Sequence, residues 1–338
     1  MDPKPKRKTN MKRHMEKQLQ QLLEERGTEI NSLAKKAMFE SEKYVKSKEV
    51  RNALHYFLDE YWTDLVRPTL MSIVSEAAGG NPQTITSAVI PIMLMAGGVD
   101  IHDDIIDKSK LKNKRLTVFG KFGQDIALLT GDALLFKGLL LLHLALQNAP
   151  KRKAKQVLSI FEKTFFELGD AEALELTLKG KINTKPDEYL QVINRKAADV
   201  EAYTQLSALL SNGTREGVDA LRKYGRILGT LAIIRDDLID MTDREELSHR
   251  LENEVVPLPM LYAFLNPEAQ SAIASLLSKK RKTKKDIGAI VKIVTENEGF
   301  IKTKECMDVL AKQALTELIP VKYKKEELEL LINTVKTI

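Results

Sequence analysis

Two short acidic motifs are the residues of this sequence best suited to chemistry. The segments VDIHDDIID (99–107) and RDDLID (235–240) each contain Asp-Asp-x-x-Asp. On a helix, the first and third aspartates of this pattern share one face, about one turn apart. Carboxylates gathered in this way repel one another and resist burial unless a cation joins them. Mg²⁺ meets that need, because it prefers a few carboxylates together with water and substrate phosphate oxygens.

A single motif of this kind is typical of a solvated helix end. Two copies in similar apolar contexts, on separate helices, favour a metal-dependent site instead. The expected metal ligands are the outer aspartates, namely Asp103, Asp107, Asp236 and Asp240. The expected catalytic carboxylates are Asp103, Asp104, Asp107, Asp236 and Asp237.

The elements that must position these motifs are helices. Gly (17) and Pro (11) are scarce among the 338 residues, and 43% of the residues are hydrophobic. Apolar residues recur at helical spacing from about residue 15, and no alternating strand pattern is present. We therefore expect an all-α fold, with a single domain over residues 15–338 and a disordered basic tail over residues 1–14.

Charge and cysteine content bear on the partners and the compartment. The formal net charge is +6, and basic residues cluster in residues 1–14 and in KKRKTKK (279–285), without interleaved aromatic residues. We interpret these clusters as solvated, so nucleic-acid binding is not expected, while peripheral contact with an anionic membrane stays open. A cytoplasmic protein is favoured by the single cysteine and by the lack of an apolar leader. No membrane span is expected, because the apolar segments are short (87–99) or interrupted by charges (126–146).

Longer segments around the motifs resemble the trans-isoprenyl diphosphate synthases, also called the polyprenyl synthetase family. In chain order, the segments are IHDDIIDKS (101–109), TVFGKFGQDIALLTGDALL (117–135), EYLQVINRKAADV (188–200) and YGRILGTLAIIRDDLID (224–240). The resemblance implies an isoprenoid-synthase-type helical bundle around a central cavity, with the two aspartate motifs facing each other across its mouth.

The resemblance also implies a reaction. Three Mg²⁺ ions clamp the diphosphate of an allylic substrate, and the departing diphosphate leaves an allylic cation that alkylates isopentenyl diphosphate. Lys196 is added to the catalytic and substrate-binding residues, because its segment resembles the helix that carries an allylic-diphosphate lysine. The implied partners are both diphosphates and either a second copy of the chain, as a homodimer, or a related subunit.

The basic residues of the allylic site are partly changed from the family pattern. Lys112 stands where the family has an arginine, and Lys196 is kept but is followed by Ala197 in place of a threonine. The lysine expected after the second motif has no clear match, and His249 or Arg250 is the candidate substitute.

The basic residues of the isopentenyl diphosphate site are changed further. The matching stretch WTDLVRP (62–68) keeps Arg67 but has Asp64 in place of a lysine. Each lost charge-assisted bond removes roughly 1.5–3 kcal/mol of binding free energy. The residues available to compensate are Lys114, Arg115 and Lys121, unless a partner subunit supplies the missing charge.

Two further residues near the first motif are candidates for the site. Asp100 shares a helical face with Asp103 and Asp107, where the family has an apolar residue. It either pairs with Arg67 or a lysine, or adds a metal-shell or general-base carboxylate. His102 matches a family position and is expected to orient a carboxylate at the substrate site.

Small residues before the first motif bear on product length. In this family, bulky residues four or five positions before the motif stop the growing chain, and here those positions are Val99 and Gly98. A helix rises about 5.4 Å per turn, close to one isoprene unit, so Gly97 and Gly98 indicate a product of 20 carbons or more above a floor at Met95. Close helix packing at these glycines is the alternative.

Three functions are compatible with these residues. The first is a magnesium-dependent trans-prenyltransferase that condenses an allylic diphosphate with isopentenyl diphosphate, which the two complete motifs favour. The second is a class I terpene synthase or a prenyltransferase with a different acceptor, which the altered isopentenyl diphosphate site favours. The third is a non-elongating subunit of a heteromeric prenyl diphosphate synthase, which the lost basic residues favour and the six intact carboxylates disfavour.

Overall fold

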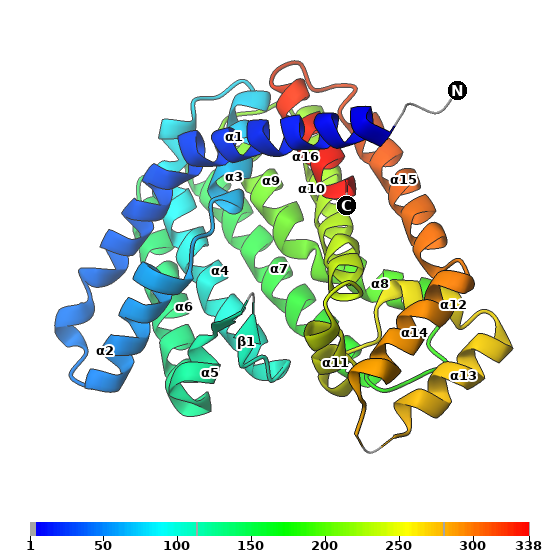
Figure 1. The fold of residues 1–338 in the computed structure, drawn as a ribbon. Helices are drawn as coiled ribbons and strands as arrows, with labels where there is room; N and C mark the ends of the chain where they lie inside the picture. Colours follow the sequence, from blue (N-terminus) through cyan, green and yellow to red (C-terminus); the bar gives the residue numbers. More distant parts are fainter. Residues whose placement is uncertain (1–4, 113, 280, 338) are drawn as a thin grey trace. The chain divides into compact units, whose positions relative to one another are not determined.

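The computed structural model describes residues 5–112, 114–279 and 281–337, with side chains from residue 13 onward (Figure 1). These residues are helical apart from short connections and one hairpin, whose two strands have two residues each. The all-α prediction is therefore confirmed. They belong to two compact units, residues 1–158 with 207–213 and residues 159–206 with 214–338. The one-domain arrangement over residues 15–338 stays a prediction.

The first unit is built around helix α4, which lies beside α6 (Figure 1). Its elements are α1 (Pro5–Phe39), η1 (Glu42–Tyr44), α2 (Lys48–His55), the π-helical η2 (Tyr56–Tyr61), α3 (Val66–Ala77), η3 (Pro82–Ile85), α4 (Thr86–Ile106), β1 (Leu111–Lys112), β2 (Arg115–Leu116), α5 (Val118–Phe122), α6 (Gln124–Leu146) and the start of α7 (Lys151–Leu178). Residues 88–98 of α4 are almost continuously apolar and are buried throughout but for Ile90. A helix that is apolar on all sides is expected in a core.

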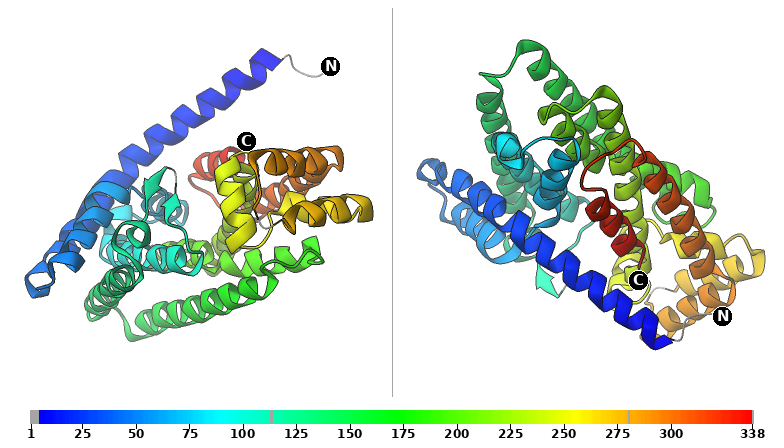
Figure 2. Two further views of the ribbon diagram at one scale, coloured as in Figure 1. Left: turned by 60° about the horizontal axis from the view of Figure 1, so that its bottom comes forward. Right: turned by 90° about the horizontal axis from the view of Figure 1, so that it is seen from above.

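Helix α1 is one long helix, drawn in blue in Figures 1 and 2, that packs against α3 and α4. It begins at Pro5, whereas the sequence predicted a disordered tail over residues 1–14. The structure differs from that expectation from Pro5 onward, because lysine, arginine and methionine are good helix formers and extending an existing helix is easier than starting one. Residues 1–4 lie outside the described residues.

The second unit is built around helix α10, which contacts α8, α12, α15 and α16. Its elements are the rest of α7, α8 (Pro186–Lys196), α9 (Ala198–Leu210, up to residue 206), α10 (Arg215–Asp240), α11 (Arg244–Asn253), α12 (Leu258–Ala263), α13 (Pro267–Leu277), α14 (Lys284–Glu296), α15 (Gly299–Glu317) and α16 (Lys325–Lys336). The buried hydroxyl of Tyr224 donates to the carbonyl of Leu328 at 2.8 Å, which joins α10 to α16.

Two helical segments are long and apolar enough, by length and composition, to cross a membrane, although the sequence was expected to contain no span. The segment 82–106 is mostly buried within the protein, as is usual for a core helix. Helix α6 is mostly exposed. Its exposed apolar side chains are Leu128, Leu129, Phe136, Leu139, Leu140 and Leu144, and we call this surface the α6 apolar face.

Candidate active site

The first aspartate motif lies at the end of α4, which stops at Ile106 with Asp107 as its C-cap. The Asp103 side chain is 31% exposed, whereas that of Asp104 is buried at 6%. Lys112, on β1, reaches both carboxylates, with Nζ–O distances of 3.3 Å to Asp103 and 2.8 Å to Asp104. The short hairpin therefore brings the predicted allylic-site lysine to Asp103, a predicted metal ligand, and to Asp104, a predicted catalytic carboxylate.

Burial and charge act in opposite directions within this group. Burial raises the pKa of Asp104 to about 6, and the Lys112 ammonium offsets only part of that rise. Burial also opposes the charge on Lys112, but the carboxylates of Asp103 and Asp104 outweigh it and hold the pKa of Lys112 well above its usual range. Lys112 is therefore a permanent cation among these acids.

The second aspartate motif forms the last turn of α10. Its middle residue, Asp237, is fully buried and accepts hydrogen bonds from the Tyr189 hydroxyl (3.1 Å) and the backbone N–H of Leu258 (2.8 Å). Arg250, on α11, donates to Asp237 and to Asp240. Of the two candidates for the missing lysine, Arg250 is thus the one at the motif, while His249 lies near Asn253 and Glu254.

The two motifs share one arrangement, in which the middle aspartate is buried against a cation. The first aspartate is more accessible in both, with 31% of the Asp103 side chain and 67% of the Asp236 side chain exposed. Within the described ranges, no group of three or more His, Cys, Asp or Glu residues already converges on a metal position. The motifs lie in different units, so their facing each other stays a prediction.

Lys196, the last residue of α8, is bound by two glutamates of α7. Its Nζ lies 2.8 Å from Glu172 and also pairs with Glu175, while the adjacent Arg195 pairs with Asp170. These acids were not predicted from the sequence. The available signal was the i, i+3 spacing of Glu172 and Glu175, which places both on one helical face.

Arg67, at the start of α3, is held by two carboxylates, and we call Asp64, Arg67 and Asp100 the Arg67 clamp. The guanidinium donates to both oxygens of Asp100, at 2.8 and 3.0 Å, and to Asp64 at 2.8 Å. The other oxygen of Asp64 accepts the backbone N–H groups of Val66 and Arg67. Of the two roles left open for Asp100, the structure therefore contains the pairing with Arg67.

Two other candidate donors for isopentenyl diphosphate also have partners within the first unit. Arg115 donates to the carbonyl of Glu60, and its guanidinium lies 5.6 Å from the centre of the Tyr61 ring. The Lys121 ammonium lies 3.5 Å from the centre of the Tyr56 ring and 4.0 Å from the Glu60 carboxylate. An incoming anion must compete with these contacts.

His102 faces α6, and the carboxylate that it contacts is Asp132 rather than a motif aspartate. Its Nε2 atom lies 3.4 Å from Asp132 and 3.5 Å from the carbonyl oxygen of Leu128. A Cβ atom at Gly131 would lie 2.6 Å from the imidazole, so the glycine provides the space for this ring.

The residues expected to set product length are in close contact with their neighbours. A Cβ atom at Gly97 would lie 3.0 Å from the Phe57 ring, and one at Gly98 would lie 2.7 Å from a backbone oxygen of α6. Met95 is buried against α6, and Val99 is half-buried. At both glycines the structure therefore shows the close packing that was the alternative to an open tail pocket.

Comparisons with known proteins agree with the architecture of both units. The family model described as "Polyprenyl synthetase" matches residues 47–294. The geranylgeranyl diphosphate synthase of Methanosarcina mazei is 26% identical over 253 residues, which are 74% of this chain and 77% of that protein. A (2E,6E)-farnesyl diphosphate synthase of Mycobacterium tuberculosis is 29% identical over 54% of this chain and 50% of its own length. The crystal structure of geranylgeranyl pyrophosphate synthetase from Pyrococcus horikoshii has the same fold, with a TM-score of 0.81, 23% identity and coverage of 95% of this chain and 99% of that one.

Proposed function

This chain belongs to the polyprenyl synthetase family, and from that premise we propose that it is a magnesium-dependent trans-prenyltransferase acting on an allylic diphosphate. The observation that carries the proposal is the repeated Asp-Asp-x-x-Asp arrangement, with a buried, cation-bound middle aspartate and a more accessible first one. Accessible carboxylate oxygens are the ligands that Mg²⁺ prefers, so the donor set fits this ion.

The outer aspartates are the proposed metal ligands, and the family resemblance implies three ions. The ligands are Asp103, Asp107, Asp236 and Asp240. Bound Mg²⁺ supplies positive charge that neutralises the departing diphosphate. The middle aspartates, Asp104 and Asp237, act instead by holding Lys112 and Arg250 at the motifs.

The proposed ligands of the allylic diphosphate on the chain itself are Lys112, Lys196 and Arg250. Each of these cations is paired with carboxylates of the protein, so the diphosphate oxygens of the substrate replace those carboxylates as its partners. Charge-assisted hydrogen bonds of this kind strengthen as negative charge develops on the leaving group, which lowers the barrier to ionisation. The double bond of the acceptor then attacks the allylic cation to form a carbon–carbon bond, and loss of a proton from the resulting cation completes the condensation.

We propose isopentenyl diphosphate as the acceptor and a polyprenyl diphosphate of 20 carbons or more as the product. The relatives named geranylgeranyl diphosphate synthases support this length, whereas the relative named farnesyl diphosphate synthase points to a shorter product. Gly97 and Gly98 lend the longer product no support, because their space is filled by neighbouring residues.

The Arg67 clamp favours a second candidate function. Arg67 is the basic residue kept from the expected isopentenyl diphosphate site, and Asp64 and Asp100 already surround it with two negative charges. A chain with this clamp is suited to ionise an allylic diphosphate while taking a different acceptor, or while a related subunit provides the second diphosphate site.

One assay separates these functions. The purified chain, Mg²⁺ and an allylic diphosphate are incubated with and without isopentenyl diphosphate, and the extracted products are identified by mass. We expect longer diphosphates only when isopentenyl diphosphate is present. Hydrocarbon or alcohol formed without it indicates a terpene synthase or another acceptor, and turnover that requires an added subunit indicates a heteromer. If no allylic diphosphate is consumed under any of these conditions, the proposal fails.

We further propose that the chain is cytoplasmic and forms a homodimer through the α6 apolar face. Leu140 is 63% exposed in the middle of this face, and a contiguous apolar face of this kind is typical of a protein–protein interface. Leu140→Glu is expected to halve the mass measured by sedimentation, because a buried charge without a partner disfavours association. The matched control is Leu265→Glu, an equally exposed leucine of the second unit, which should leave the mass unchanged. Co-sedimentation of the unaltered chain with vesicles that Leu140→Glu abolishes would indicate instead that α6 lies against lipid.

A further inference from the structure

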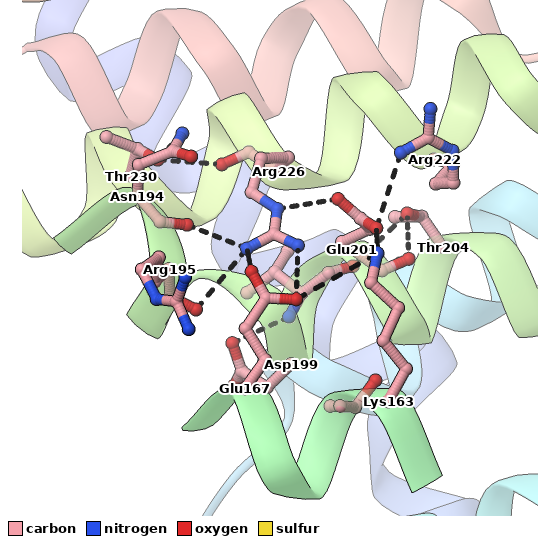
Figure 3. Close-up of polar contacts among 12 residues, drawn as sticks. Lys163, Glu167, Asn194, Arg195, Asp199, Glu201, Thr204, Arg222, Arg226 and Thr230 are labelled. Atoms are coloured by element: carbon pink, nitrogen blue, oxygen red, sulfur yellow. Dashed lines mark hydrogen bonds and ion pairs between the residues drawn. The ribbon is translucent and has the colours of Figure 1, made fainter. Parts of the chain in front are cut away.

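Arg226, on α10, is bound by groups from three other helices of the second unit (Figure 3). Its Nε donates to Glu201 of α9 at 2.6 Å, and its terminal nitrogens donate to Glu167 of α7 at 2.8 and 3.2 Å. From Nη1 it also donates to the backbone carbonyls of Asn194 and Arg195, at 2.8 and 3.3 Å. These carbonyls belong to the last turn of α8.

The last carbonyls of a helix have no partner within the helix, and a guanidinium there both hydrogen-bonds them and complements the negative end of the helix dipole. Arg226 therefore holds the backbone directly before Lys196, the final residue of α8. A second tie lies one turn further along α10, where the Asn194 side chain donates to the Thr230 hydroxyl at 3.3 Å. At Gly229, the absence of a side chain allows Ala197 to approach α10, because a Cβ atom there would lie 2.8 Å from the Ala197 Cβ.

Two acids fix the orientation of the Arg226 guanidinium. Glu201 is buried, and burial opposes its ionisation, but the hydrogen bond from Arg226 and the charges of Arg226, Lys163 and Arg222 outweigh that effect and lower the pKa of Glu201. Glu201 is thus ionised when it binds Arg226. Glu167, held on α7, binds the opposite part of the same guanidinium, so its direction toward α8 is set from both sides (Figure 3).

We propose that Arg226 is a positioning residue, which fixes the last turn of α8 and so places Lys196 relative to the aspartate motif at the end of α10. Arg226 and Asp236 lie on the same uninterrupted helix, so a tie at Arg226 sets α8 against the motif itself. The inference rests on the proposed function in one respect, namely that Lys196 binds the allylic diphosphate.

Arg222 provides a matched control for Arg226. It lies one turn earlier on α10 and also pairs with Glu201, at 3.3 Å, but among the described residues its other contacts are with Asp219 of α10 rather than with α8. Arg222→Met and Arg226→Met each remove one cation from Glu201, and only the second releases the α8 carbonyls. Melting temperatures of both variants report the loss of stability that they share.

Hydrogen exchange and ligand binding are the two measurements. In Arg226→Met, we expect amide exchange over residues 194–197 to become about tenfold faster and the affinity for magnesium pyrophosphate to fall about tenfold, as for the loss of a charged hydrogen bond. In Arg222→Met, both should change less than about twofold. Arg226→Lys keeps one charged donor and should recover part of both effects, which a general loss of stability would not produce.

Two results would overturn the inference. The first is equal exchange at residues 194–197 in the Arg222 and Arg226 variants. The second is faster exchange in Arg226→Met with unchanged pyrophosphate affinity, because Lys196 would then bind regardless of how α8 is held. Failure of the unaltered chain to bind magnesium pyrophosphate counts against the proposed function, and the exchange comparison still decides whether Arg226 holds α8.

Discussion

Replacing Asp103 by asparagine is expected to lower the turnover of an allylic diphosphate by about 10²–10³-fold at fixed magnesium concentration. The amide keeps the size of the carboxylate but loses the anionic oxygen that a hard divalent cation prefers. The charge that develops on the departing diphosphate is then less well neutralised. Asp103 is partly exposed, and Lys112 keeps its contact with Asp104, so the variant is expected to fold. The measurement is diphosphate release in a single turnover, repeated over a magnesium titration.

The control for this variant is Asp125→Asn, which removes an equally negative side chain from the exposed first turn of α6. Its turnover should stay within about twofold of the unaltered chain, as expected for an exposed surface position. If Asp103→Asn also stays within that range, the motif at the end of α4 does not hold the metal that the reaction requires.

Replacing Asp100 by asparagine is expected to tighten the binding of isopentenyl diphosphate about tenfold. The Asp100 carboxylate occupies both terminal nitrogens of Arg67, and the amide offers only one oxygen and no charge. Arg67 then loses its two-point carboxylate partner, while the contact with Asp64 stays, and its terminal nitrogens regain capacity for a diphosphate. Asp64 is the less suitable residue to change, because it also accepts the first backbone N–H groups of α3. Calorimetric titration with isopentenyl diphosphate measures the effect without depending on turnover.

Asp100→Glu is the matched comparison, since it keeps the negative charge and should retain the weak binding. The Michaelis constant for the allylic diphosphate should stay unchanged in both variants, which shows that the motif one turn away is intact. Unchanged or weaker binding of isopentenyl diphosphate in Asp100→Asn would mean that the Arg67 clamp does not control access to an acceptor site.

The helical fold follows from local patterns, and for that reason the sequence predicted it. The i, i+4 spacing of Asp103 and Asp107 alone indicates that these two aspartates share a helical face. Asp104 lies on a different face of the same helix, and in the structure that face is buried. The pairing of Asp100 with Arg67 was one of two predicted outcomes, because opposite charges near one another on neighbouring helices are expected to pair.

Other contacts between helices were not predicted. The binding of Lys196 by Glu172 and Glu175 joins residues more than 20 positions apart, and no local pattern reports that contact. The surroundings of Gly97 and Gly98 could not be predicted for the same reason, because a small residue indicates space without indicating which group fills that space. In this chain an aromatic ring and the backbone of α6 fill it.

The Lys112 and Arg250 side chains at the two acidic motifs affect the stability of the folded protein before metal or substrate binds. The buried Asp237 carboxylate is paired with Arg250 and accepts a backbone N–H group, and the buried Asp104 carboxylate is paired with Lys112, so part of the cost of burying each charge is offset before a metal binds. Because the buried aspartate of each motif already has a cation as its partner, chelation of magnesium is expected to lower the turnover of an allylic diphosphate while leaving the melting temperature unchanged.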